Sequence, residues 1–240
     1  MFRSVLTAGA GALTTVPAFF LWTRNCNIED LPTTDELFRN AWFAKYNPTP
    51  APKAEMRDVC VRRYPLSQIR PELVEDARRG GTAMIESFNQ GIWGGFGYAF
   101  QRWYLRQRYG ALPETQSQLW TKQSLLQSKY DTGTAFTDHL VVLNKTPQSI
   151  ILRGGQSPRN QPETPRDMDG LLEIQAVPDF DNGYVDFKFK SVFFAGTGFD
   201  ASSGAKVVPD PLVWAHKQYT KLLVESGLRR VRNQVWFSGG

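Results

Sequence analysis

Apolar and polar positions follow two different periods along the chain, and the change of period separates a helical part from a strand-rich part. Residues 57–64 alternate with a period of two and predict a first strand. A short helix is predicted from Pro71 to the stop at Gly80, and apolar residues at helical spacing then predict one helix over 82–109. From about residue 117 to 195 the period is mostly two, which is typical of antiparallel strands.

Four strands are predicted in this second part, over the ranges Gly133–Leu143, Ser149–Arg153, Gly170–Val177 and Tyr184–Phe194. The sequence Asp181-Asn182-Gly183 indicates a tight hairpin between the last two. In the last strand, Phe187, Phe189 and Ser191 share one face, whereas Lys188 and Lys190 lie on the other. We therefore expect an antiparallel meander with one solvated face.

The last predicted element is a helix that Asp210 caps, Pro211 begins and Gly227 ends. One stripe of this helix is mainly apolar and consists of Leu212, Ala215, His216, Tyr219, Leu222, Leu223 and Ser226. The order of strand, two helices, several strands and a C-terminal helix predicts an α+β fold.

The chain is predicted to have three parts: an apolar leader over 1–24, a linker with one short helix over 25–56, and a single α+β domain over 57–240. The leader has no acidic residue, and its apolar run is about as long as the roughly 18 residues that span a bilayer. A signal anchor, a cleaved secretory signal and an organelle presequence stay open. We expect a membrane-associated or organellar protein, in the endoplasmic reticulum or mitochondrion, and otherwise a cytoplasmic one.

Composition excludes several classes of function. The net charge of +5 is modest and not concentrated in long basic runs, so no nucleic-acid partner is expected. The densest basic stretch, Arg102, Arg106 and Arg108, is interleaved with aromatic residues. Two isolated histidines and no C-x-x-C pattern predict no metal site. Cys26 and Cys60 are either a disulfide or two free thiols, and the oligomeric state stays open.

The element order over roughly residues 55–230 resembles the helix-grip fold of the START-like and polyketide-cyclase-like superfamily. In that fold a curved antiparallel sheet wraps a long C-terminal helix around a cavity. The chain is also similar to small uncharacterised proteins of filamentous fungi, in the sequences Val61-Arg62-Arg63, Gly94-Gly95-Phe96-Gly97-Tyr98, Thr137-Asp138-His139 and Lys190-Ser191-Val192-Phe193. The helix-grip resemblance implies a cavity that holds a small molecule.

The candidate site residues follow from that cavity. His216 and Tyr219 in the helix stripe, together with His139 and Glu173 on strands, are the candidates for proton transfer and orientation. Asp138 and His139 are expected on opposite faces of one strand. The candidate ligand-binding residues are Ser191, Phe187, Phe189, Trp93 and Arg153. Each of them also has a purely structural interpretation, as a core or hydrogen-bonded residue.

Gly91, Gly94, Gly95 and Gly97 lie within the predicted helix 82–109, where each glycine costs about 1 kcal/mol relative to alanine. Close packing against the sheet, a kink that opens a ligand port, or an aromatic segment resting on a membrane surface would each explain them.

The sequence supports two hypotheses for the function. The first is binding of a mid-sized apolar molecule in an internal cavity, with cofactor-free cyclase, isomerase or dehydratase chemistry of secondary metabolism if the protein is an enzyme. The alternative is a non-catalytic lipid carrier or membrane-associated binding protein. A weaker third interpretation, a hot-dog acyl-thioester enzyme, requires the sheet to wrap the helix 82–109 instead of the C-terminal one.

Overall fold

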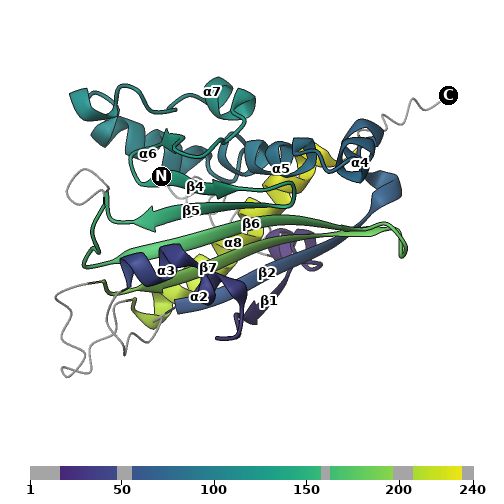
Figure 1. Cartoon of the computed structure of the whole chain (residues 1–240), viewed down its shortest axis with the longest axis horizontal. Coiled ribbons are helices and arrows are strands. Elements are labelled where there is room, and N and C mark those ends of the chain that lie inside the picture. The colour runs from purple at the N-terminus through teal and green to yellow at the C-terminus, as the bar shows by residue number, and fades with distance from the viewer. Residues whose placement is uncertain (1–16, 48–55, 158–162, 197–207, 234–240) are drawn as a thin grey trace, which may run out of the picture.

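The computed structural model describes residues 17–47, 56–157, 163–196 and 208–233. It has an α+β fold built on a curved seven-stranded antiparallel sheet, with the strand order β1-β2-β7-β6-β5-β4-β3 (Figure 1). The strands are β1 (Asn27–Asp30), β2 (Met56–Pro65), β3 (Ala135–Phe136), β4 (Leu140–Lys145), β5 (Ser149–Gly155), β6 (Asp169–Asp179) and β7 (Tyr184–Phe194). The first strand of the predicted domain therefore pairs with the last, and β1 extends this edge.

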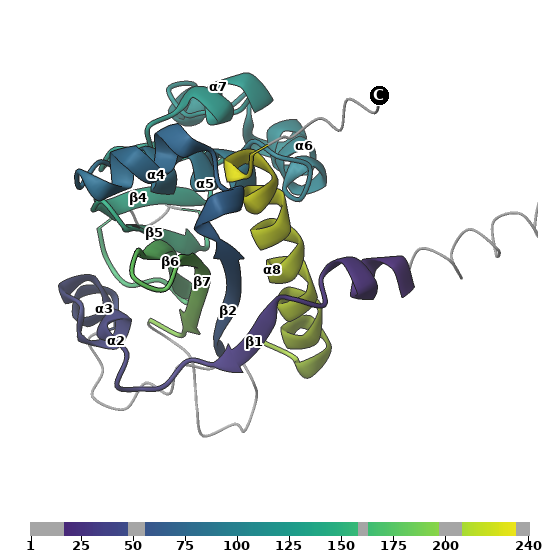
Figure 2. The ribbon, with the colours of Figure 1, turned by 90° about the vertical axis from the view of Figure 1, so that its right-hand side faces the viewer.

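Helices cover both faces of the sheet. They are α2 (Glu36–Arg39), α3 (Ala41–Tyr46), α4 (Pro71–Arg78), α5 (Ala83–Trp93), α6 (Ala99–Tyr109), α7 (Lys122–Gln127) and α8 (Asp210–Val231). Figure 2 shows the sheet between α8 on one side and α2 with α3 on the other. The larger core lies under α5 and α8, and a smaller core lies under α2 and α3.

Most of the predicted strands are confirmed. The last strand has the predicted bounds. In the turn that precedes this strand, Gly183 adopts the positive φ of 74° that the turn requires. The predicted strand Gly133–Leu143 is wrong as one element, because Thr137 and Asp138 both have positive φ and divide it into β3 and β4. The short helix α7 lies in the stretch where the pattern predicts strands.

Two helix boundaries also differ from the expectation. The predicted helix 82–109 is two helices, α5 and α6, joined by a turn over 94–98. Arg102 helps to close this break, because its guanidinium donates a 2.9 Å hydrogen bond to the carbonyl of Trp93. Gly227 does not end the C-terminal helix: α8 continues to Val231, and Gly227 lies where α8 packs on Phe88 and Ile92.

The segment over 25–56 contributes to the fold more than a linker would. β1 adds a strand to the sheet, and α2 and α3 cover the face on which Val192 and Lys190 lie. The expectation of one solvated sheet face is therefore wrong for this region. Lys190 is buried there in ion pairs with Asp35 and Glu173, both at 2.9 Å.

Residues 1–16 of the predicted leader lie outside the described residues, and residues 17–22 are helical. Among the helices that the structure describes, none has both the length and the apolar character needed to cross a membrane. Cys26 and Cys60 are free thiols that are both buried. The hydrogen bond to Cys60 and burial raise the pKa of the Cys26 thiol well above its usual range.

The closest helix packing joins α5 and α8. A Cβ atom on Gly91 would lie 2.7 Å from the backbone oxygen of Gly227 and 2.8 Å from its Cα. Ser226 links the same two helices, because its hydroxyl donates a 2.8 Å hydrogen bond to the carbonyl of Gly91. Gly91 therefore serves close packing of α5 against α8, and not against the sheet, which was one of the three explanations of the glycines.

This contact predicts whether substitution of Gly91 by alanine raises or lowers the free energy of unfolding. Gly91→Ala should raise the free energy of unfolding by about 1 kcal/mol on helix propensity alone. The steric conflict with Gly227 should reverse this and lower it by about 1–3 kcal/mol, measured by urea denaturation. Ala215→Gly, at an exposed position of α8, calibrates the propensity effect. An unchanged or increased stability of Gly91→Ala would contradict the close crossing.

Candidate functional site

Three polar side chains meet between the sheet and α8. Asp58 of β2 and Ser191 of β7 are direct partners in the sheet register, on the face that α8 covers. His216 of α8 reaches both: its Nε2 lies 3.1 Å from the Ser191 hydroxyl and 3.5 Å from Oδ2 of Asp58. Thr220, one turn further along α8, has its hydroxyl 3.3 Å from the same nitrogen. The structure thus brings together two of the predicted site residues, His216 and Ser191.

The cluster is largely closed to solvent. Asp58 and Ser191 are fully buried, and 20% of the His216 side chain is exposed. Neither carboxylate oxygen of Asp58 has a hydrogen-bond partner among the described residues. A buried carboxylate needs a compensating partner, and the imidazole of His216, at 3.5 Å, is the ionisable group that contacts it.

These residue types form hydrolytic triads in other proteins, but the geometry here is different. In a triad the carboxylate binds Nδ1 of the histidine, so that Nε2 is free to take the proton of the nucleophile. Here Ser191 and Asp58 both approach Nε2, and Ser191 is inaccessible. The arrangement suits binding or proton donation by His216 and does not support nucleophilic attack by Ser191.

Tyr219 lies on α8 apart from the oxygen atoms of this cluster. Its hydroxyl is buried and has no hydrogen-bond partner among the described residues. Burial raises the pKa of Tyr219, and the nearby Tyr98 raises it further. The phenol therefore stays protonated at neutral pH and can donate or accept a hydrogen bond, but it cannot act as a base.

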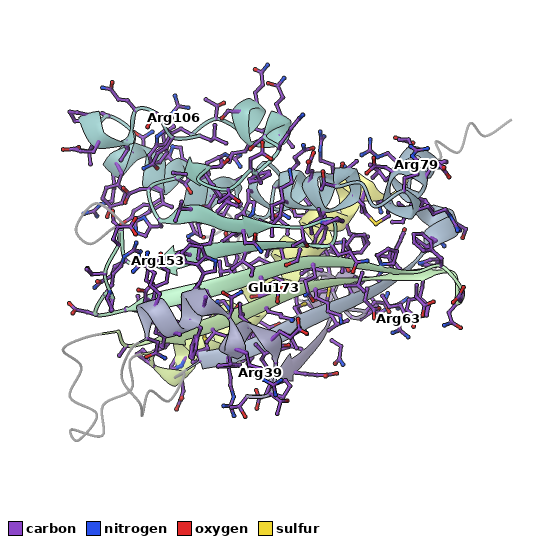
Figure 3. The ribbon with its side chains drawn as sticks, in the orientation of Figure 1. Arg39, Arg63, Arg79, Arg106, Arg153 and Glu173 are labelled. Atoms are coloured by element: carbon purple, nitrogen blue, oxygen red, sulfur yellow. The ribbon has the colours of Figure 1, made fainter. Side chains whose placement is uncertain are left out.

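Glu173 lies on the opposite side of the sheet, in the smaller core (Figure 3). Its Oε1 accepts a 2.7 Å hydrogen bond from Ser149, and its Oε2 pairs with Lys190. Burial lowers the pKa of Lys190, but the charges of Glu173 and Asp35 outweigh this and raise it above its ordinary value. The sheet thus separates Glu173 from His216, and the two cannot act on one reacting group.

His139 lies in the turn before β4 and not in the middle of a strand. The left-handed backbone of Thr137 and Asp138 allows the Asp138 carboxylate to approach Nδ1 of His139 at 3.1 Å. The expectation that these neighbours point to opposite faces is therefore wrong. The His139 ring lies 5.4 Å from the ring of Tyr109, at the end of α6.

The remaining predicted ligand-binding residues are parts of the two cores. Phe187, Phe189 and Trp93 are buried, and the Trp93 ring lies 6.0 Å from that of Phe189. Arg153 lies in the smaller core (Figure 3), where it forms a bidentate ion pair with Asp169, at 2.9 and 2.6 Å. Both side chains of this pair are fully buried, so Arg153 anchors the start of the loop instead of facing a ligand.

Among the described residues, no group of three or more His, Cys, Asp or Glu side chains is placed to hold a metal ion.

Two surface features lie outside the predicted cavity site, and only the aromatic one was expected, as one of the three explanations of the glycine cluster. The helix α6 exposes Phe100 (75%), Trp103 (57%) and Tyr104 (44%), and its only buried residue is Leu105. A cleft of about 710 Å³ lies between α5 and the end of α8 and is lined by several arginines. The basic sequence Arg229-Arg230 could have indicated this cleft, but such residues also occur at the end of a helix for its dipole alone.

In comparisons with known proteins, no family model, no curated protein and no solved structure matches this chain.

A double-mutant cycle tests the contact between Asp58 and His216. His216→Gln should lower the free energy of unfolding by about 1–3 kcal/mol, because the buried carboxylate loses its compensating neighbour. In an Asp58→Asn background the same substitution should cost at least about 1 kcal/mol less. His139→Gln, whose contact is with Asp138, is the control and should cost the same in both backgrounds. Additive effects of Asp58→Asn and His216→Gln would show that the contact carries no energy.

Proposed function

We propose that the protein associates with the surface of an anionic membrane through α6 and the turn that precedes it. The observation that carries this proposal is the composition of the exposed side of α6. Phe100, Trp103 and Tyr104 are exposed there, and the helix has three arginines and no acidic residue. Exposed aromatic residues beside arginines are typical of helices that lie in the membrane interface.

The aromatic surface extends beyond α6. The rings of Phe100 and Trp103 lie 5.8 Å apart, and the ring of Phe96 in the preceding turn lies 5.6 Å from that of Trp22. Trp22 and Phe96 are each more than 40% exposed. The end of the predicted leader therefore meets the α5–α6 turn, so that an apolar N-terminal segment and α6 can contact one surface together.

The arginines of α6 support an orientation in which α6 faces the membrane. Arg106 lies on α6 at the edge of the molecule opposite Arg39 (Figure 3). Each arginine or lysine near an anionic membrane surface contributes about 1 kcal/mol to binding. Because this attraction is screened by salt, membrane association should weaken as the ionic strength rises.

We also infer that the fold is of the helix-grip type, an arrangement that suits a role in binding lipid. Three features support this assignment: β2 pairs with β7, α8 follows β7 in the chain, and α8 packs on the face of the sheet that carries Phe187 and Phe189. In this arrangement a carrier would take its ligand between α8 and the sheet.

Vesicle co-sedimentation of the full chain tests the membrane proposal. Phe100→Ala/Trp103→Ala should weaken binding to phosphatidylcholine vesicles that contain phosphatidylserine by about tenfold or more, because two exposed interfacial anchors are lost. Leu212→Ala/Trp214→Ala is the matched control, since these residues are similarly exposed, at 59% and 61%, on the first turns of α8. Equal loss in both variants, or equal binding to vesicles of phosphatidylcholine alone, would contradict the proposal.

A second candidate function is the binding of a mid-sized apolar molecule beside His216. The buried Asp58 carboxylate, which has no hydrogen-bond partner within the described ranges, favours it, because a ligand with one donor group would satisfy that charge. Native mass spectrometry of the full chain should then detect a co-purified molecule that Ser191→Phe removes. A clean unliganded mass, unchanged after incubation with lipid extracts, would count against this candidate.

A further inference from the structure

A cleft with a strong excess of positive charge lies at the C-terminal end of α8, between α5, α7 and the residue that precedes α4. It measures about 710 Å³, and its described lining carries five cations: Arg70, Lys122, Arg229, Arg230 and Arg232. No carboxylate belongs to the described lining. Like charges gathered in one cleft repel each other, so their convergence calls for an explanation.

Helix dipoles do not supply that explanation. Arg229 and Arg230 lie in the last turn of α8, where a cation is favourable. Arg70, however, directly precedes α4, and Lys122 is the first residue of α7. A cation at the start of a helix is opposed by the helix dipole. Three separate elements therefore direct positive charge into one cleft, two of them against the local field.

Neighbouring acidic residues do not neutralise the cleft either. Among the described residues, Arg229, Arg230 and Arg232 form no ion pair; Arg230 binds only neutral oxygens, Oε1 of Gln90 at 3.0 Å and the carbonyl of Leu126 at 3.2 Å. Arg70 pairs with Glu72 at 3.3 Å, but 64% of the Glu72 side chain is exposed and it does not line the cleft. The Nε atom of Arg70 is buried and has no hydrogen-bond partner in the described part of the chain.

The positive charge of Arg70 also acts on Arg230. Burial lowers the pKa of its guanidinium below the usual value, and the charge of Arg70 lowers it further. A bound anion would offset this repulsion. The planar guanidinium group presents paired donors that match the oxygens of a phosphate group.

We propose that this cleft binds the phosphate group of a phosphomonoester whose other end is apolar or aromatic. The apolar part of the ligand has a surface to contact, because Phe96 lines the cleft and also lines an adjoining depression of about 310 Å³. Trp22 and Leu228 complete the apolar wall of that depression. Its polar residues are Arg229, Arg232 and Glu225, of which Glu225 pairs with Arg62. Such a phosphate can come from a soluble phosphomonoester or from the headgroup of a membrane lipid, and the cleft suits both by the same chemistry. The inference is independent of membrane association through α6.

Isothermal titration of the full chain with phenyl phosphate, at constant ionic strength, tests the cleft with a soluble probe. Arg229→Ala/Arg232→Ala should weaken binding by about tenfold or more, because two charge-assisted hydrogen-bond donors are lost. Both side chains are exposed and without ion-pair partners among the described residues, so the fold should tolerate their truncation. Arg39→Ala/Arg106→Ala is the control of equal charge away from the cleft, with both residues marked in Figure 3, and should bind phenyl phosphate as the wild type does.

A second experiment, vesicle binding, distinguishes the two sources of the phosphate group. If only a lipid headgroup is bound, phenyl phosphate gives no heat, and the protein prefers phosphatidic acid over phosphatidylserine in vesicles of equal charge. Arg229→Ala/Arg232→Ala should abolish this preference, whereas Phe100→Ala/Trp103→Ala should reduce binding to both vesicles alike. Phenyl phosphate binding that survives Arg229→Ala/Arg232→Ala, or the absence of both phenyl phosphate binding and the phosphatidic acid preference, would overturn the proposal.

Discussion

The close crossing of α5 and α8 is the constraint on which the functional surface depends. Gly91 and Gly227 let the two backbones approach within a distance that excludes a Cβ atom on Gly91. α5 ends at Trp93, close to this crossing, and the turn over 94–98 lies beside Ser226. The hydroxyl of Ser226 accepts a hydrogen bond from the amide of Gly97 at 3.2 Å, which fixes this turn against α8. The same crossing places the arginines at the end of α8 next to Phe96 and forms the cleft.

Buried charges in this fold lie beside groups of opposite charge, whereas the described lining of the cleft carries only positive charge. On the α2–α3 side of the sheet, buried charges are matched, as in the pair of Arg153 with Asp169 and the cluster around Lys190. Beneath α8, β2 is joined to the helix by the ion pair of Arg62 with Glu225, at 2.9 Å, and by the contact of Asp58 with His216. At the α5–α8 end, positive charge accumulates without a described acidic partner in the lining. Since unpaired charges of one sign oppose folding, their accumulation at one end favours a role in binding an external anion.

Local patterns of the sequence predicted the elements that have a regular period. The bounds of β7, the turn at Gly183 and the start of α4 at Pro71 follow from alternation and turn chemistry. The break at 94–98 was expected only as a kink within one helix, because the apolar residues of α5 and α6 continue the helical period across it. The division of β3 from β4 depends on two non-glycine residues with positive φ, Thr137 and Asp138, which no pattern indicates.

Sequence patterns predicted only part of the candidate site. His216 and Ser191 were expected to face one space because each lies within an apolar stripe of its element, and the structure places them 3.1 Å apart. Asp58 was missed because β2 has Val59 and Val61 on the opposite face, which indicated that the polar face was solvated. The arginine cleft was missed because its cations come from positions 70, 122 and 229–232, and only the tertiary fold brings them together.

Hydrogen–deuterium exchange of the full chain, with and without vesicles of phosphatidylcholine and phosphatidic acid, tests the central claim most directly. The account predicts that vesicles protect the turn over 94–98, α6 and the end of α8 over 226–232, because these segments form the aromatic surface and the cleft. Protection confined to α2, α3 and the β6–β7 hairpin, or no protection in any segment, would contradict the assignment of the binding surface to the α5–α8 end of the molecule.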